Sequence, residues 1–212
     1  MCRCSRSVPH GWTGVKPLTD LGLYAITFYN DLEVDRRTLE AYARFRDDAA
    51  AQGMRHFLEI FNPHFPVATG DVEFGLYNND CIVRCLAGVS RLDRPLFLKM
   101  AYNGPRAMAE LASYDPDHLV VGILGGSAGT TRDCLELLKQ AEYYGARVAL
   151  FGRKIYFAED SVLMVRAMRR VLEQDISSEE GVRVYHEELQ QQGIRPKRSL
   201  ADDLEITEAV LK

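Results

Sequence analysis

Two short apolar segments each carry one charged residue at their centre, and the two charges have opposite signs. The segment HFLEIFNP at 56–63 holds Glu59, and the segment PLFLKMAYNG at 95–104 holds Lys99. A buried charge is costly to desolvate unless it is paired or coordinated. A carboxylate and an amine retained in such segments are therefore either paired with each other or used in a reaction.

The alternation of side chains along a strand predicts where these two groups point. In extended segments Glu59 shares a face with Phe57, and Lys99 shares the matching face of the next strand with Phe97. Desolvation favours the neutral form of an amine, and a neutral lysine can attack a carbonyl to form a Schiff base, with a glutamate shuttling protons. A structural salt bridge is the alternative, because an ionised carboxylate stabilises a charged amine.

A glycine-rich turn, GILGGSAGTTRD, occupies residues 122–133. Its glycines Gly125, Gly126 and Gly129 let the backbone approach a ligand, and the following helix offers the positive end of its dipole to an anion. No Gly-Lys-Ser/Thr follows, so the turn is not a P-loop. The alternative is an ordinary strand-to-helix turn capped by a threonine.

A second turn, FGRKIYFAED, occupies residues 151–160. Gly152 lets a ligand approach the backbone, and the planar guanidinium of Arg153 suits bidentate phosphate binding. The loops after the last two strands of a barrel commonly bind phosphate. The two turns together therefore predict a phosphate site. Tyr102 and Asn103 follow Lys99 directly and are candidate substrate contacts.

The segments that position these residues alternate between apolar strands and helices. Strands are predicted at 21–30, 54–63, 95–104, 118–126 and 146–153, and helices at 34–53, 80–93, 105–114, 130–145 and 161–175. This alternation predicts a parallel sheet with helices outside it. The first strand is followed by no glycine-rich dinucleotide fingerprint, which favours an α/β (β/α) TIM barrel over a doubly wound sheet.

The predicted organisation has three parts. Residues 1–20 form a poorly ordered lead-in, residues 21–175 a partial (β/α) barrel, and residues 176–212 a C-terminal helical extension with helices at 177–193 and 200–212.

Composition narrows the function class. The 212 residues carry a net charge of −4 with interspersed charges, which argues against nucleic acid as a partner. The chain has five irregularly spaced cysteines and no predicted signal peptide, which indicates a cytoplasmic protein without a disulfide framework or a metal site. No apolar run is long enough to span a bilayer, so no membrane partner is expected.

The motifs FLEIF, FLKMAYNG, ILGGSAGTTRDCLELLKQAEYYGA and ALFGRKIYF, in this order, resemble the class I (Schiff-base) aldolases of the DeoC/LacD/DhnA type. This family includes tagatose-bisphosphate aldolase and archaeal-type fructose-bisphosphate aldolase. The resemblance covers residues 22–165 and corresponds to strands 4–8 of an aldolase-type TIM barrel. It implies a lyase that needs no cofactor and acts on a sugar phosphate.

The resemblance also implies residue roles. Lys99 would be the Schiff-base lysine and Glu59 an acid/base group, whereas the phosphate ligands would be Gly125, Gly126, Ser127, Gly152 and Arg153. Five parallel strands leave two open edges, so we expect either a shortened reading frame or a homo-oligomer. A non-catalytic sugar-phosphate-binding protein and an isomerase or epimerase, in which Glu59 takes a proton and Lys99 stays charged, are the alternative functions.

Overall fold

The computed structural model of the protein describes residues 19–125 and 129–212. Its five strands form one parallel sheet in the order β1-β2-β3-β4-β5. The strands are β1 (Leu21–Thr27), β2 (Arg55–Phe61), β3 (Phe97–Met100), β4 (Val120–Leu124) and β5 (Val148–Leu150). Each strand pairs with the next one along the chain, which is the arrangement of a continuous segment of a barrel. The predicted parallel α/β architecture is confirmed.

A helix follows each strand, and further helices complete the C-terminal part. They are α1 (Leu32–Ala51), α2 (Phe74–Leu86), α3 (Pro105–Tyr114), α4 (Thr131–Tyr143), α5 (Arg153–Tyr156), α6 (Ser161–Glu173), α7 (Ser178–Gln191), α8 (Leu200–Asp203) and the 3-10 helix η1 (Ala209–Leu211). The helix α2 begins six residues before the predicted start at residue 80. The short helix α5 was not predicted.

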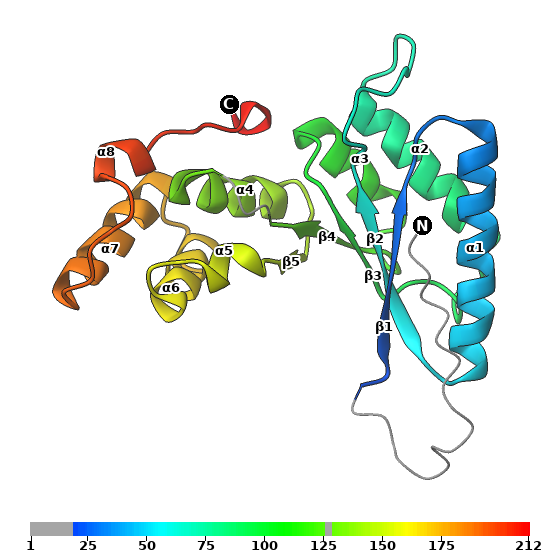
Figure 1. Ribbon diagram of the computed structural model, residues 1–212, viewed down its shortest axis with the longest axis horizontal. Coiled ribbons are helices and arrows are strands. Elements are labelled where there is room, and N and C mark those ends of the chain that lie inside the picture. Colours follow the sequence, from blue (N-terminus) through cyan, green and yellow to red (C-terminus); the bar gives the residue numbers. More distant parts are fainter. Residues whose placement is uncertain (1–18, 126–128) are drawn as a thin grey trace.

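The sheet is strongly twisted. In Figure 1, β1 rises steeply through the view whereas β4 and β5 cross it almost horizontally, as the handed twist of a parallel sheet requires. Helices α1, α2 and α3 lie on the side of β1–β3, and α4, α6 and α7 gather around the end of the sheet formed by β4 and β5. Because all five strands are parallel, their C-terminal ends lie at the same edge of the sheet, which we call the rim. The candidate phosphate-binding turns follow these strand ends.

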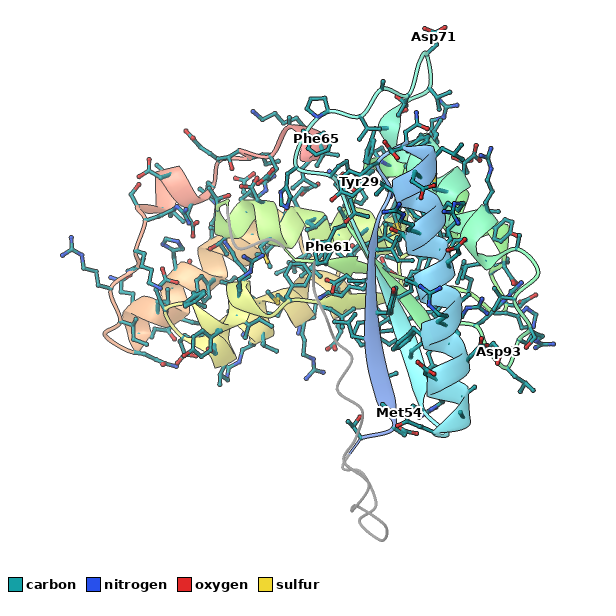
Figure 2. All side chains as sticks on the ribbon, turned by 45° about the vertical axis from the view of Figure 1, so that its right-hand side comes forward. Tyr29, Met54, Phe61, Phe65, Asp71 and Asp93 are labelled. Carbon is teal, nitrogen blue, oxygen red and sulfur yellow. The ribbon has the colours of Figure 1, made fainter. Side chains whose placement is uncertain are left out.

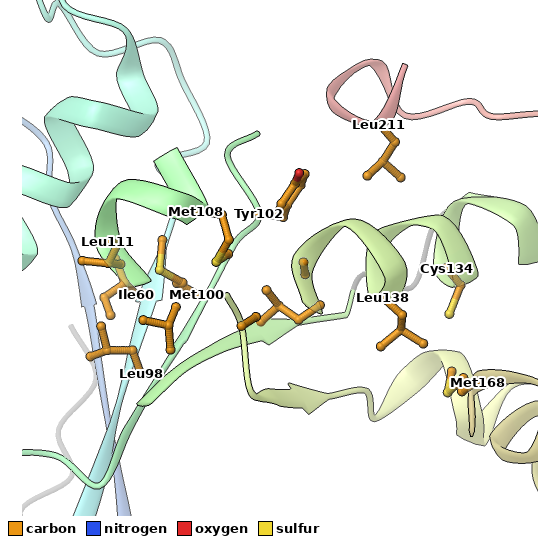
Figure 3. Packing of buried hydrophobic residues seen from close by; sticks show 14 of the residues in the cluster. Ile60, Leu98, Met100, Tyr102, Met108, Leu111, Cys134, Leu138, Met168 and Leu211 are labelled. Atoms are coloured by element: carbon orange, nitrogen blue, oxygen red, sulfur yellow. The ribbon is translucent and has the colours of Figure 1, made fainter. Parts of the chain in front are cut away.

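One face of the sheet forms the core with the helices. Leu58, Ile60 and Leu98 are completely buried, and Figure 3 shows Ile60 and Leu98 beside Met108 and Leu111 of α3. Burying such side chains contributes roughly 1.5–3 kcal/mol each relative to exposure. A second part of the same core contains Leu138 of α4 and Met168 of α6 (Figure 3).

The opposite face, which we call the inner face, is largely uncovered. Leu23 and Phe61 are 49% and 43% exposed, and Val120 is also exposed. Figure 2 shows Phe61 near Tyr29 and Phe65 at the upper ends of β1 and β2. This face is only partly buried, and Glu59 near its centre is 5% exposed. In a closed barrel it would be the interior, and both β1 and β5 are free edges here.

The C-terminal part differs from its prediction. Helix α7 forms as expected and packs on α4 and α6. The predicted helix at 200–212 is wrong, because only α8 and η1 are helical there. Asp203 and Thr207 are instead held by hydrogen bonds to Thr131 and Asp133 at the start of α4, so tertiary bonds replace a continuous helix. Within the described ranges, no helix is both long and apolar enough to cross a membrane.

Candidate functional site

Glu59 and Lys99 are direct neighbours on the inner face. They are paired residues in the register of β2 and β3, and 2.6 Å separates Glu59 Oε1 from Lys99 Nζ. The carboxylate side chain is 7% exposed and the lysine side chain 22% exposed. The predicted adjacency is therefore present, and the amine retains a route to solvent.

The surroundings of this pair are mainly apolar. One step towards the start of the strands, Phe57 and Phe97 stack with their ring centroids 4.7 Å apart. On the β1 side the partner of Glu59 is Ala25, which carries only a methyl group. The two rings form an apolar floor beneath the ion pair, which strengthens electrostatic interactions relative to water.

Gly122 of β4 is the partner of Lys99 on the other side. A Cβ at this position would lie 2.6 Å from the carbonyl oxygen of Leu98, so glycine is required by the close approach of β3 and β4. As a result, β4 places no side chain beside Lys99.

The two candidate substrate contacts, Tyr102 and Asn103, follow the end of β3, and both form hydrogen bonds with other side chains of the protein. The Asn103 amide exchanges hydrogen bonds with Asn62, which follows β2. The Tyr102 hydroxyl donates to Gln140 Oε1 at 3.0 Å, and burial raises the pKa of this tyrosine to about 12. Tyr102 therefore stays protonated and orients towards α4, whereas Asn103 stands on the rim above Lys99.

The glycine-rich turn has a structural requirement of its own. A Cβ on Gly125 would lie 2.1 Å from Cδ1 of Phe151, so no larger residue fits against this ring. Gly126 and Ser127 lie outside the described residues. Gly129 adopts a φ of +83°, the left-handed conformation that glycine tolerates best.

The start of α4 is already occupied by carboxylates. Asp133 accepts a hydrogen bond from Thr130 N in a capping box, and Asp203 accepts one from Thr131 N at 2.7 Å. Burial raises the pKa of both aspartates, but their hydrogen bonds together outweigh it and hold each pKa below its usual range. The helix dipole expected to attract a phosphate is thus used mainly by the protein itself.

The basic turn after β5 contains one candidate site residue, Lys154, that the sequence did not predict. Gly152 and Arg153 are exposed at the start of α5, as predicted. The adjacent Lys154 turns inwards and donates from Nζ to the carbonyl oxygens of Thr130 at 2.8 Å and Gly129 at 3.3 Å. The order Arg-Lys in FGRKIYF was the available signal, but which cation turns inwards depends on the helical path of α5.

Lys154 also connects two hollows at the rim. The first, of about 190 Å3, lies between the ends of β3, β4 and β5, and its lining includes Ala101, Leu124 and Phe151. The second, of about 100 Å3, lies beside Arg153 and the C-terminal segment. The side chain of Lys154 lines both hollows. This cation therefore borders the hollow at the ends of β3, β4 and β5 as well as the hollow beside Arg153.

Metal and thiol chemistry have no obvious site in the described ranges. No group of three or more histidine, cysteine, aspartate or glutamate side chains there is arranged to hold a metal ion. Burial raises the pKa of the Cys85 and Cys134 thiols to about 12, which keeps both protonated.

The fold of the chain is similar to that of solved aldolase structures. An archaeal fructose 1,6-bisphosphate aldolase superposes with a TM-score of 0.51 at 17% identity, covering 69% of this chain and 56% of that one. A fructose-bisphosphate aldolase from Slackia heliotrinireducens DSM 20476 superposes with a TM-score of 0.52 at 18% identity, covering 77% and 52%. The chain has the fold of part of an aldolase barrel.

The similarity to the two solved structures covers only part of each of them. The chain spans about half the length of these two structures, in agreement with an incomplete barrel of five strands. No family model matches the sequence, and no curated protein matches it either. At these identities the likeness concerns the fold, and the chemistry has to be argued from the residues.

Proposed function

We propose that the protein is a class I aldolase-like lyase in which Lys99 forms a Schiff base with a phosphorylated ketose. The observation that carries this proposal is the 2.6 Å contact between Lys99 Nζ and Glu59 Oε1 on the face that forms a barrel interior. The two solved structures that share the fold are described as fructose-bisphosphate aldolases, which supports the reaction class. The aldolase assignment rests on these two supports together.

The reaction begins with a proton transfer inside the pair. Glu59 takes a proton from the Lys99 ammonium, and the neutral amine adds to the ketose carbonyl carbon to form a carbinolamine. Glu59 returns this proton to the carbinolamine oxygen, then takes a second proton from the nitrogen and passes it to the same oxygen, which leaves as water and gives an iminium. The contact distance suits this transfer, because proton exchange requires the heavy atoms within hydrogen-bond reach.

The iminium then serves as the electron sink. Glu59, which is a carboxylate again, takes the proton from the hydroxyl next to the scissile bond. That bond breaks, and its electron pair forms an enamine on Lys99 while an aldehyde leaves. Protonation of the enamine carbon regenerates the iminium, and water releases the ketone and restores the amine. Every electron stays within substrate and lysine, so the cycle requires no metal and no redox cofactor.

Substrate positioning comes from the rim. The phosphate group is held at the basic turn by Gly152, Arg153 and Lys154. Gly125, Gly126 and Ser127 of the glycine-rich turn are the further proposed phosphate ligands, of which only Gly125 lies within the described residues. Asn103, which follows β3 and bonds to Asn62, is the proposed contact for the sugar hydroxyls. We place this activity in the cytoplasm and expect neither nucleic acid nor membrane as partner.

Turnover can be measured directly as the release of triose phosphate from fructose 1,6-bisphosphate. Wild-type protein is expected to show cleavage that is unchanged by EDTA, and Lys99→Met is expected to abolish it. Arg169→Met, on the outer side of α6 where Arg169 pairs with Glu173, is the control for removing a cation. Cleavage that persists in Lys99→Met would refute the proposal.

The exposed inner face favours a second candidate, a sugar-phosphate-binding protein without turnover. Leu23 and Phe61 are about half exposed, although a working aldolase site excludes water from its intermediates. A second copy of the chain covering this face would restore the enclosure, and we propose such a homo-oligomer as the active form. Binding of dihydroxyacetone phosphate that is equal in wild type and Lys99→Met, with no turnover in either, would support the non-catalytic candidate.

A further inference from the structure

A small polar cavity lies between the start of α5 and the C-terminal segment, beside the beginning of α4. Its volume is about 100 Å3, which is roughly that of three water molecules in the liquid. A cavity of this size has room for one phosphoryl group. The charged side chains that line the cavity are Arg153, Lys154, Lys197, Arg198, Glu159 and Asp203.

Both carboxylates of this cavity are already engaged by the protein. Glu159 accepts a hydrogen bond from the backbone N–H of Lys197 at 2.8 Å and a second from a tyrosine hydroxyl. Asp203 accepts one from the first residue of α4 and lies 2.9 Å from His186 Nε2. Their lone pairs thus fix the C-terminal segment in place, and the cations face the cavity.

The cations are not balanced in the same way. Lys154 donates to backbone carbonyl oxygens, and so does Lys197. In the ranges that the structure describes, Arg153, Lys154 and Lys197 make no ion pair with a carboxylate, and Arg198 is 3.9 Å from Asp203. Four cations and two carboxylates leave an excess of two positive charges in a chain whose net charge is −4.

We propose that this cavity binds the phosphate group of the substrate, and that Lys197 and Arg198 of the C-terminal segment are phosphate-binding residues alongside Arg153 and Lys154. The inference rests on the proposed function for the identity of the ligand. It moves phosphate recognition from the start of α4, whose first N–H groups Asp133 and Asp203 occupy, to a cluster of side-chain cations. The segment after α7 thereby becomes part of the binding site rather than a helical appendage.

The test is isothermal titration calorimetry of the full chain with inorganic phosphate and with dihydroxyacetone phosphate. Lys197→Gln/Arg198→Gln is expected to weaken both affinities by about tenfold or more, because it removes two charge-assisted contacts. The matched control is Arg36→Gln/Arg37→Gln on α1, which removes two cations that pair with Glu33 far from the cavity. The control is expected to bind within about twofold of wild type.

Several results would overturn the inference. Unchanged affinity in Lys197→Gln/Arg198→Gln would do so, and so would equal losses in the control, which would indicate a net-charge effect. Wild type that binds neither ligand at millimolar concentration would also overturn it. Should the double variant fail to fold, the single variant Arg198→Gln, which keeps the Lys197 contacts, decides the question and is expected to bind about fivefold more weakly.

The fate of this inference can be separated from that of the proposed function. Borohydride trapping with dihydroxyacetone, which has no phosphate, tests Lys99 without using the cavity. An adduct on Lys99 together with unchanged phosphate affinity in Lys197→Gln/Arg198→Gln would remove the inference and keep the lyase. Weakened phosphate binding without any adduct would keep the cavity and remove the lyase.

Discussion

Glu59 and Lys99 face each other across the paired strands β2 and β3, with 2.6 Å between the carboxylate oxygen and the amine nitrogen. The stacked rings of Phe57 and Phe97 lie one pair of residues nearer the start of the two strands. This contact joins a proton acceptor to a potential nucleophile. It also makes the stability of the sheet depend on both charges.

The two halves of this pair should contribute unequally to stability. Lys99→Met leaves the almost fully buried Glu59 without a partner and is expected to lower the free energy of unfolding by about 3 kcal/mol. Glu59→Gln leaves a lysine that can reach solvent and is expected to cost about 1 kcal/mol. Urea unfolding followed by circular dichroism measures both values.

A matched pair on the surface controls this comparison. Arg169→Met breaks the exposed contact with Glu173 and should cost less than about 0.5 kcal/mol. The double variant Glu59→Leu/Lys99→Met should lie within about 1 kcal/mol of wild type, because a buried ion pair is often replaceable by apolar residues. Equal losses for Lys99→Met and Arg169→Met would contradict the burial of the pair.

Substitution of two glycines at the rim should have different effects, one on stability and the other on phosphate binding. Gly125→Ala places a methyl group against the Phe151 ring and is expected to destabilise the fold by about 1–3 kcal/mol. Gly152 has open space where its Cβ would be, so Gly152→Ala should leave the melting temperature unchanged and weaken phosphate binding. Thermal melts and phosphate titrations of both variants check this division. A stable Gly125→Ala protein would show that the ring moves freely.

The attachment of the C-terminal segment to the start of α4 should weaken as the pH falls. The pKa of Asp133 and that of Asp203 are held below the ordinary value of 3.8 in the folded protein, because hydrogen bonds to the carboxylates outweigh burial. A depressed carboxyl pKa stabilises the fold above the unfolded pKa, and this contribution is lost as the pH falls through the folded one. Unfolding free energies measured from about pH 5 to about pH 3 should therefore fall.

Asp203→Asn identifies the residue behind that slope. The variant keeps an oxygen for the Thr131 N–H bond but cannot titrate, so its stability should fall less steeply with acid than that of wild type. Identical slopes would assign the acid sensitivity to other carboxylates. His64→Gln, an exposed substitution away from α4, should leave the slope of the wild type unchanged.

The uncovered inner face predicts self-association. Leu23→Ser/Phe61→Ser should shift sedimentation velocity profiles from an oligomer to the 24.0 kDa monomer, because the two substitutions remove apolar surface from the contact. Leu32→Ser/Leu92→Ser removes two side chains that are even more exposed but lie elsewhere, and should leave the profile unchanged. A wild-type protein that sediments as a monomer would contradict the proposed homo-oligomer.

The sequence was sufficient for the sheet and for the central pair. Glu59 and Lys99 occupy matching positions in consecutive apolar segments, and parallel pairing of neighbours with a side-chain period of two fixes their common face. The C-terminal segment could not be predicted in this way. The segment was predicted to be a polar-faced helix, but its path is set by two hydrogen bonds at the start of α4, one that Asp203 accepts from Thr131 N and one that the Thr207 hydroxyl donates to Asp133.

The cationic cavity could not be predicted from the sequence either, because it also depends on contacts between residues far apart in the chain. Lys197 and Arg198 are separated from Arg153 by more than forty positions, and no local pattern links them. They meet because Glu159 accepts a hydrogen bond from the Lys197 backbone. Contacts of this kind depend on the tertiary path of the chain, whereas strand pairing depends on repeated local patterns.

The central claim is that Lys99 forms a covalent intermediate. Intact-mass spectrometry after incubation with dihydroxyacetone phosphate or fructose 1,6-bisphosphate and sodium borohydride, followed by peptide mapping, tests it most directly. The account predicts one reduced adduct that maps to Lys99 in wild type and is absent from Lys99→Met. A folded protein that gives no adduct, or an adduct on another lysine, would contradict it.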